Sequence, residues 1–296
     1  FSLPVPPSLK ARVLRFFELS PSCLGKHFMK HSLDNDLSKE DFQRDEENFK
    51  LKPLSLEETF KFSCHRGVSC FNKCCHQIDV ILTPFDILKL KSALGINSGA
   101  FLSKYAFFQQ LKGTGIPIVK LRMGENSGGA CIFLDVNSGC TVYGNRPLVC
   151  RTYPIGSASI DPRQGESRDS HFIIMEEMCR GHEENKRWKL KEWMQDQGAS
   201  EIEELNKPWL ETVAKLKAMK LEDKHQHQIS LFIMVCYDLD TFQDFVANSS
   251  LLERFGVERE TADLINKDQQ ELLKFGFEWL QFALFGEGNI CPKKGP

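Results

Sequence analysis

Four cysteines lie within twelve residues, between Cys64 and Cys75, in the segment FSCHRGVSCFNKCC. The segment contains a glycine and several turn-forming residues and has no helical period, which predicts a loop. Thiolate ligands must converge on one point, and side chains on a regular helix or strand seldom do so. We therefore expect the rest of the chain to be organised around this loop.

Further cysteines follow at wider spacing, and eight of the eleven in the chain lie between residues 64 and 179. In a reducing compartment such a number favours metal binding or catalysis over disulfides. Soft thiolates select zinc, copper(I) or iron–sulfur clusters, and eight ligands make two sets of the usual four. The candidate metal ligands are Cys64, Cys70, Cys74, Cys75, Cys131, Cys140, Cys150 and Cys179.

Among the possible cofactors we favour an iron–sulfur cluster, of the 4Fe-4S type. Zinc or mononuclear iron is the alternative, since zinc also accepts four thiolates, although only Cys70 and Cys74 approach the paired spacing of zinc modules. Disulfides come third. Adjacent side chains on an extended backbone point to opposite sides. The Cys74–Cys75 pair therefore predicts either two centres or one centre with spare cysteines.

Two arginines, Arg146 and Arg151, flank Cys150 in the segment YGNRPLVCRTYP. Cationic side chains beside thiolates lower the thiol pKa and offset the negative charge of a cluster. We assign both to cofactor binding, with pairing to surface carboxylates as the alternative. We do not assign the histidines next to cysteines, His65, His76 and His182, as ligands, because exposed or core histidines are more common.

The overall composition points away from nucleic acid and membranes. The net charge of −2 gives no global field that would favour nucleic acid or an anionic membrane. The longest apolar run, residues 229–237, is far shorter than the ~20 residues needed to cross a bilayer. No signal peptide opens the sequence from Phe1. We expect a cytoplasmic protein with a protein partner, no nucleic acid and no membrane span.

The predicted fold class is α+β: a small cysteine-rich metal-binding core with short strands and helices, followed by an α-helical C-terminal region. We place an N-terminal extension at 1–59, the cysteine-cluster domain at 60–200 and a helical region packed on it at 201–296. Within the extension, helices are expected after Ser8 and after Ser38.

Turn and capping signals divide the domain further. Thr83 as N-cap and Pro84 at the first position start a helix that Gly95 ends. Alternation of apolar residues predicts strands. Further helices are expected at 99–111, capped by Ser98, at 188–198, and at 201–220, where Pro208 should start a new segment or introduce a kink. Strands are expected at 78–82, 116–123 and 171–176, and a hairpin should pair 131–135 with 141–143. Residues 157–170 are expected to form a loop.

Three parts of the sequence together resemble the YkgJ-type cysteine-cluster family, which is described as zinc- or iron-chelating and carries a CxxCxxCC motif. They are FSCHRGVSCFNKCC with LTPFDILKLKSALGI after it, GACIFLDVNSGCTVYGNRPLVCRTYP, and Cys179 with WKLKEWMQDQG, and they cover about residues 60–200. The resemblance implies a metal-ligand role for the eight candidate cysteines. The gaps of five and three residues after Cys64 and Cys70 look more like the branch that includes flagellin lysine N-methylases, which join an iron–sulfur cluster with S-adenosylmethionine chemistry.

Three functions remain open from the sequence. A thiolate-only ligand set without an acid–base constellation favours an iron–sulfur protein that transfers electrons or serves as an accessory subunit. The second is a cluster-dependent methyl or group-transfer enzyme that uses S-adenosylmethionine, although neither a Gly-rich loop after a strand nor a CxxxCxxC triplet stands out. The third is a zinc or iron storage or delivery protein.

Overall fold

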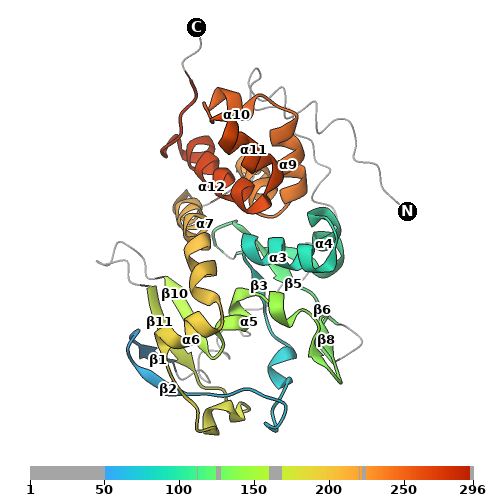
Figure 1. Ribbon diagram of the computed structural model, residues 1–296, viewed down its shortest axis with the longest axis vertical. Coiled ribbons are helices and arrows are strands. Elements are labelled where there is room, and N and C mark those ends of the chain that lie inside the picture. The colour runs from blue at the N-terminus through green and yellow to red at the C-terminus, as the bar shows by residue number, and fades with distance from the viewer. Residues whose placement is uncertain are drawn as a thin grey trace. The chain divides into compact units, whose positions relative to one another are not determined.

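The computed structural model describes residues 51–111, 113–124, 128–159, 169–219, 221 and 225–293, so the helices predicted after Ser8 and Ser38 lie outside the described part of the chain. The described residues up to Met219 form one compact unit, the cysteine-rich unit, and those from Leu221 onward belong to a second, the C-terminal unit. Short strands and helices in the first and helices in the second confirm the predicted α+β class (Figure 1).

One end of the cysteine-rich unit is built from two small antiparallel sheets. The first has the strand order β1-β11-β10, with β1 (Leu51–Leu54), β11 (Asp169–Ile174) and β10 (Ile155–Ser159). The second pairs β2 (Thr59–Lys61) with β12 (Arg187–Lys189). Side chains from both sheets and the following helix form one core of Leu54, Phe60, Phe62, Ile155, Ile173, Leu190, Trp193, Met194 and Ala199. Phe62, whose ring meets Trp193 edge-on at 5.5 Å, leads from this core into the cysteine loop.

A third sheet supports the other side of the cysteine loop. Its order is β3-β5-β4, with β3 (Ile81–Leu82), β5 (Pro117–Leu121) and β4 (Ala106–Gln110). Helix α3 (Pro84–Leu94) starts and ends as predicted. Thr83 and Asp86 form a reciprocal capping box, and Gly95 adopts the left-handed conformation (φ 64°) that ends the helix.

The predicted helix 99–111 is wrong in its second half. Helix α4 (Ser98–Tyr105) stops at Tyr105, and the next five residues form β4 and pair with β5. The N-cap is Asn97, whose Oδ1 accepts the N–H of Ala100 at 2.7 Å, rather than Ser98. The strand is favoured here because these residues lie beside β5 and complete the edge of an existing sheet.

The predicted cysteine hairpin is shorter than expected. Strand β8 (Leu134–Asp135) pairs with β9 (Gly139–Cys140), so the chain returns before Thr141. Asp135 stabilises the turn by accepting the N–H groups of Asn137 and Ser138. Cys131 belongs to a different pair, β6 (Met123–Gly124) with β7 (Ala130–Cys131).

Two further predictions need correction. Residues 157–159 and 169–170 lie in β10 and β11 rather than in a loop, while the rest of the predicted loop, 160–168, lies outside the described residues. Trp188 lies in β12, so that helix α6 begins only at Leu190 (Leu190–Asp196). The strand predicted at 171–176 is confirmed for residues 171–174, since β11 ends at Ile174.

Helix α7 (Ala199–Met219) runs through Pro208 as one element, so the predicted new segment does not start there. It contacts α3, α5 (Leu148–Thr152) and α6, and Asn206, Trp209 and Thr212 around the proline are buried. This tertiary packing outweighs the local cost of a proline in the helix.

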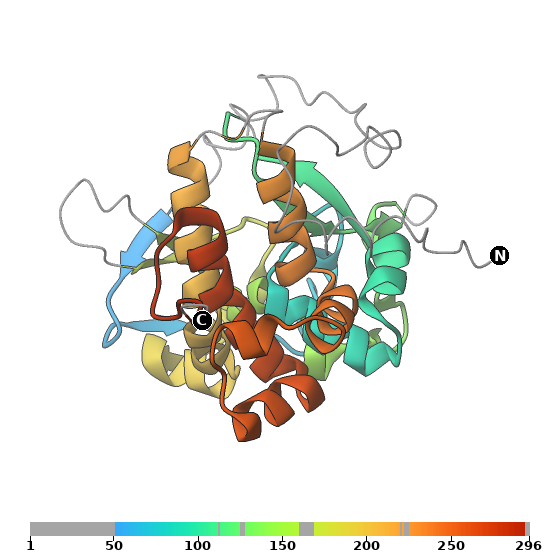
Figure 2. The ribbon, with the colours of Figure 1, turned by 90° about the horizontal axis from the view of Figure 1, so that it is seen from above.

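The C-terminal unit contains the helices α8 (Gln226–Cys236), α9 (Leu239–Ala247), α10 (Leu251–Arg254), α11 (Arg259–Lys267) and α12 (Gln269–Phe285). Helix α12 contacts α8, α9 and α11, and these helices gather side by side in Figure 2. At Gly276 the approach is close: a Cβ atom would lie 2.7 Å from Val235 Cγ1. Within the described residues, none of the helices has the length and apolarity to cross a membrane.

Candidate metal centre

The segment from Cys64 to Cys75 is a loop, as predicted, and it is built from consecutive turns. The N–H groups of Val68, Phe71 and Lys73 donate to the carbonyls of His65, Val68 and Cys70. The loop ends in the 3-10 helix η2 (Lys73–Cys75). Because only Val68 and Cys70 are buried along it, little apolar packing fixes the loop by itself.

The segment that carries Cys179 is held against this loop by backbone contacts. Cys179 precedes the 3-10 helix η6 (Arg180–Glu183). The N–H of Ser63 donates to the carbonyl of Gly181 at 3.0 Å, and the N–H of Arg180 donates to Cys70 Sγ at 3.1 Å. A Cβ atom at Gly181 would lie 2.6 Å from a ring carbon of Phe62, so this close approach requires glycine.

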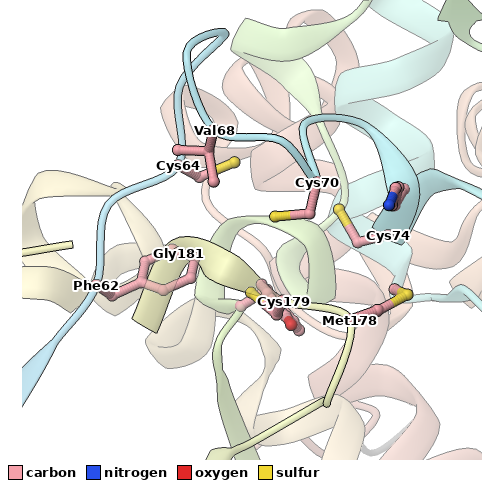
Figure 3. Close-up of a pocket in the computed structure, with 10 residues that line it drawn as sticks. Phe62, Cys64, Val68, Cys70, Cys74, Met178, Cys179 and Gly181 are labelled. Atoms are coloured by element: carbon pink, nitrogen blue, oxygen red, sulfur yellow. The ribbon is translucent and has the colours of Figure 1, made fainter. Parts of the chain in front are cut away.

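Four of the predicted ligands line one small pocket that is partly open to solvent. Three come from the loop and one from the facing segment: Cys64, Cys70, Cys74 and Cys179. Figure 3 shows the sulfur atoms of Cys64, Cys70 and Cys74 directed into the space between the loop and Cys179. The rest of the lining is Phe62, Val68, Lys73, Tyr153, Met178 and Gly181.

The thiols in this cavity lie close enough to affect one another's ionisation. Cys64 sits at the solvent edge, yet partial burial and then the neighbouring thiols of Cys74, Cys70 and Cys179 raise its pKa to about 11. The pKa of Cys74 is raised by a hydrogen bond with Cys75, by burial and by neighbouring thiols and Glu176. Clustered thiolates repel each other, and a bound cation is the group that would relieve this repulsion.

The remaining predicted ligands form a second group. Burial raises the pKa of Cys150 to about 12, with further contributions from Cys131, Asp86, Cys140 and Cys74. Burial also raises the pKa of Cys131, which is close to Cys140. An antiparallel bridge joins His76 to Ala130, the residues that follow Cys75 and precede Cys131 in the sequence.

Helix α5, which carries Cys150, is positioned by a buried carboxylate. Asp86 Oδ1 accepts the N–H of Leu148 at 2.8 Å, and Asp86 Oδ2 accepts the N–H of Thr83 at 2.8 Å. Burial raises the pKa of Asp86 to about 6, against the lowering effect of these hydrogen bonds. The sequence predicts Thr83 as the N-cap of α3, whereas the capping box with Asp86 is seen only in the structure. The contact of Asp86 with α5, 62 residues away, has no signal in the sequence.

Cys74 and Cys75 do not lie on an extended backbone. The expectation that their side chains point to opposite sides assumed such a backbone and therefore needs correction. Both belong to the 3-10 helix η2, and their side chains are in hydrogen-bonding contact. Cys74 lines the cavity with the first group and lies near Cys150 of the second. The pair therefore lies between the two groups of thiols.

Arg146 and Arg151 are placed to brace the Cys150 segment. Arg151 donates to the carbonyls of Arg146 and Gln197, both at 3.0 Å, and to that of Gly144. Arg146 donates to the carbonyl of Tyr143 and the side chain of Gln197, and it lies 4.0 Å over the Tyr143 ring. The charge of Arg146 also lowers the pKa of Cys140, against the larger raising effect of burial.

The three histidines that neighbour cysteines in the sequence each contact another protein group. His65 Nε2 lies 3.4 Å from Glu184 Oε2, His76 Nδ1 lies 3.1 Å from the carbonyl oxygen of Asn72, and the ring of His182 packs on Phe62 at 5.3 Å.

The chemistry of the thiols limits which metal groups they can hold. In the part of the chain that the structure describes, no three Cys, His, Asp or Glu side chains converge closely enough to hold a single metal ion. A tetrahedral zinc site needs every sulfur about 2.3 Å from one point, whereas an iron–sulfur cluster binds its thiolates at separate irons. The four thiols that line the pocket are therefore soft donors of the kind that bind zinc or iron.

Comparison with known proteins identifies this part of the chain. Residues 63–180 match the family model described as "CxxCxxCC: Putative zinc- or iron-chelating domain", and no curated protein and no solved structure matches the chain. The matched region includes all eight predicted ligands, from Cys64 to Cys179. Residues 63–180, about two fifths of the chain, are therefore similar to the domains that this family model describes as zinc- or iron-chelating.

Proposed function

We propose that this protein is an iron–sulfur protein whose thiolates hold two neighbouring clusters and that it transfers electrons or serves as a cluster-bearing accessory subunit. The cavity lined by Cys64, Cys70, Cys74 and Cys179 carries the proposal. It offers four soft thiolate ligands around one pocket.

The second cluster would use Cys75, Cys131, Cys140 and Cys150. Its support is the mutual proximity of the last three thiols and the bridge between His76 and Ala130, the neighbours of Cys75 and Cys131 in the sequence. Adjacent Cys74 and Cys75 would then link the two clusters, which is an arrangement suited to passing an electron between them.

The test is anaerobic purification of the full chain, followed by assay of iron, acid-labile sulfide and zinc and by absorption and electron paramagnetic resonance spectra. We expect a brown protein with about four irons and four sulfides per cluster and a paramagnetic signal on one-electron reduction. A colourless protein that contains stoichiometric zinc and no sulfide would reject the proposal.

A single zinc or iron ion is the second candidate, because the matched family description names these metals. The same four cavity thiolates would bind it after moving together around one point. Zinc in the assay with four-sulfur coordination by X-ray absorption would support this candidate against the cluster.

A further inference from the structure

Tyr153 occupies a position next to the cavity that the proposed ligand set does not explain. It follows α5, lines the cavity and packs its ring on Phe62 at 5.8 Å between centroids. Its hydroxyl donates a hydrogen bond to Glu176 Oε2 at 2.7 Å. The same hydroxyl is in hydrogen-bonding contact with Cys179.

Cys179 is the cavity ligand that most needs outside support, since it alone comes from beyond the cysteine loop. Its backbone N–H donates to the carbonyl of Glu176 at 3.0 Å, so Cys179 and Glu176 form the ends of one turn. Tyr153 therefore contacts this turn twice, once at a carboxylate and once at the ligand sulfur.

We propose that Tyr153 is a positioning residue of the cavity centre, which fixes the Cys179 sulfur and tunes the bound group by donating a hydrogen bond to that thiolate. The inference rests on the proposed function. A phenol has one proton, so the Glu176 carboxylate and the Cys179 sulfur compete for it. Hydrogen bonds to ligand sulfurs draw charge from a cluster and raise its reduction potential.

The competition gives each partner a distinct expected effect. In Tyr153→Phe the hydrogen bond to sulfur is lost, and the midpoint potential of the cavity cluster should fall. In Glu176→Gln the phenol is released toward the sulfur and a negative charge is removed, so the potential should rise. Because part of this rise acts through the phenol, it should be smaller when Tyr153→Phe is present, a measurable non-additivity.

The experiment compares the anaerobically reconstituted full-length wild type, the two single variants and the double variant by redox titration, with metal loss to a chelator measured in parallel. We expect Tyr153→Phe to retain its iron but to bind it about 10–100-fold more weakly, as is typical for loss of an outer partner of a ligand. Tyr105→Phe is the control, since its ring stacks on Phe101 and Phe133 and it is not among the cavity-lining residues.

Distinct results would overturn the inference. If the midpoint potential of the cavity cluster in Tyr153→Phe equalled that in Tyr105→Phe, Tyr153 would have only a structural role, even if iron binding were weaker. If the potential shifts of the two single variants added exactly in the double variant, Glu176 and Cys179 would not compete for the phenol proton. A wild type that binds no iron and sulfide would instead defeat the proposed function, and this inference with it.

Discussion

The backbone N–H of Arg180 donates a hydrogen bond to the Sγ atom of Cys70 across 110 residues of sequence. The side chain of Arg180 points elsewhere, to Glu183 at 2.7 Å, so the sulfur is met by a fixed backbone dipole rather than a flexible charge. The contact joins the cysteine loop to the Cys179 segment at the cavity. Two segments that lie far apart in the sequence, each with a cysteine of the pocket, are thereby brought to one site.

If two centres are present, single cysteine variants should each remove one of them. Cys70→Ser should lose the cavity centre, and Cys150→Ser the other, so that metal content falls by about half in each, because a four-ligand site seldom survives the loss of one thiolate. Metal analysis with absorption spectra of the purified variants measures this loss.

The matched control is Cys236→Ser. This cysteine is fully buried in α8 of the C-terminal unit and is outside the predicted ligand set, so metal content should stay at the wild-type level. Metal loss in this variant would show that the ligand assignment is wrong. Complete loss in Cys70→Ser with none in Cys150→Ser would mean a single centre.

Adding one methyl group at Gly181 should disturb the site without removing a ligand. The new Cβ would lie 2.6 Å from the Phe62 ring and 3.1 Å from the Ser63 carbonyl oxygen, so η6 must move away from the loop. We expect Gly181→Ala to lower the free energy of unfolding by about 1–3 kcal/mol, as overpacking does, and to weaken metal binding about tenfold or more. Urea denaturation and competition with a chelator measure the two effects.

Gly144→Ala serves as its control, because the same added atom would have no neighbour within 4 Å. Both glycines lie in the cysteine-rich unit, so a general effect of alanine would appear in both variants. Equal metal affinity in the two variants would show that the close approach at Gly181 does not position Cys179.

Local signals in the sequence predicted the elements whose structure is decided locally. The start of α3 at Thr83 and Pro84, its end at Gly95 and most of strand β11 follow from residues within a few positions of each other. Where tertiary packing decided the outcome, prediction failed. Residues 106–110 form a strand because β5 lies beside them, and α7 passes Pro208 because its buried residues pack on α3 and α5.

The candidate site, too, was predictable from local sequence signals only in part. Thiolate chemistry and residue spacing indicated a cysteine ligand field, but its division into two groups depends on a bridge between His76 and Ala130 and on the contact of Arg180 with Cys70. Tyr153 was missed because its neighbours, Glu176 and Cys179, are more than twenty residues away. Its position beside a proline after Cys150 was the only local signal.

The buried carboxylate of Asp86 should impose a pH dependence on stability. Burial raises its pKa from 3.8 to about 6, so the folded state binds the proton more tightly than the unfolded state. The contribution of Asp86 is therefore greatest below about pH 4, declines as the pH rises to about 6, and is constant above that. At 1.36 kcal/mol per unit the decline amounts to about 2–3 kcal/mol.

Asp86→Asn isolates this contribution because it removes the titration and keeps the size of the side chain. We expect the stability of the wild type relative to Asp86→Asn to decrease between pH 4 and pH 6, measured by urea denaturation of both proteins at each pH. A wild type that instead gains stability relative to the variant over this range would mean that the folded protein lowers the pKa of Asp86.

Removal of the metal should loosen the cysteine segments selectively. The loop from Cys64 to Cys75 has only two buried residues, and the Cys179 segment is held to it by a few backbone hydrogen bonds such as Ser63 to Gly181. Segments with so little apolar burial open at low free-energy cost unless ligand bonds hold them. The C-terminal helices, in contrast, have cores of buried side chains such as Phe232, Phe242 and Phe277.

Hydrogen exchange before and after anaerobic treatment with a chelator measures this difference. We expect about tenfold or greater acceleration at residues 63–76, 130–150 and 176–184, including the amide of Arg180 that donates to Cys70. Exchange in α8, α9 and α12 should be unchanged, which makes these helices an internal control. If the three cysteine-bearing segments kept their protection after complete metal loss, the fold around the thiols would stand without metal, and binding and local folding would not be coupled.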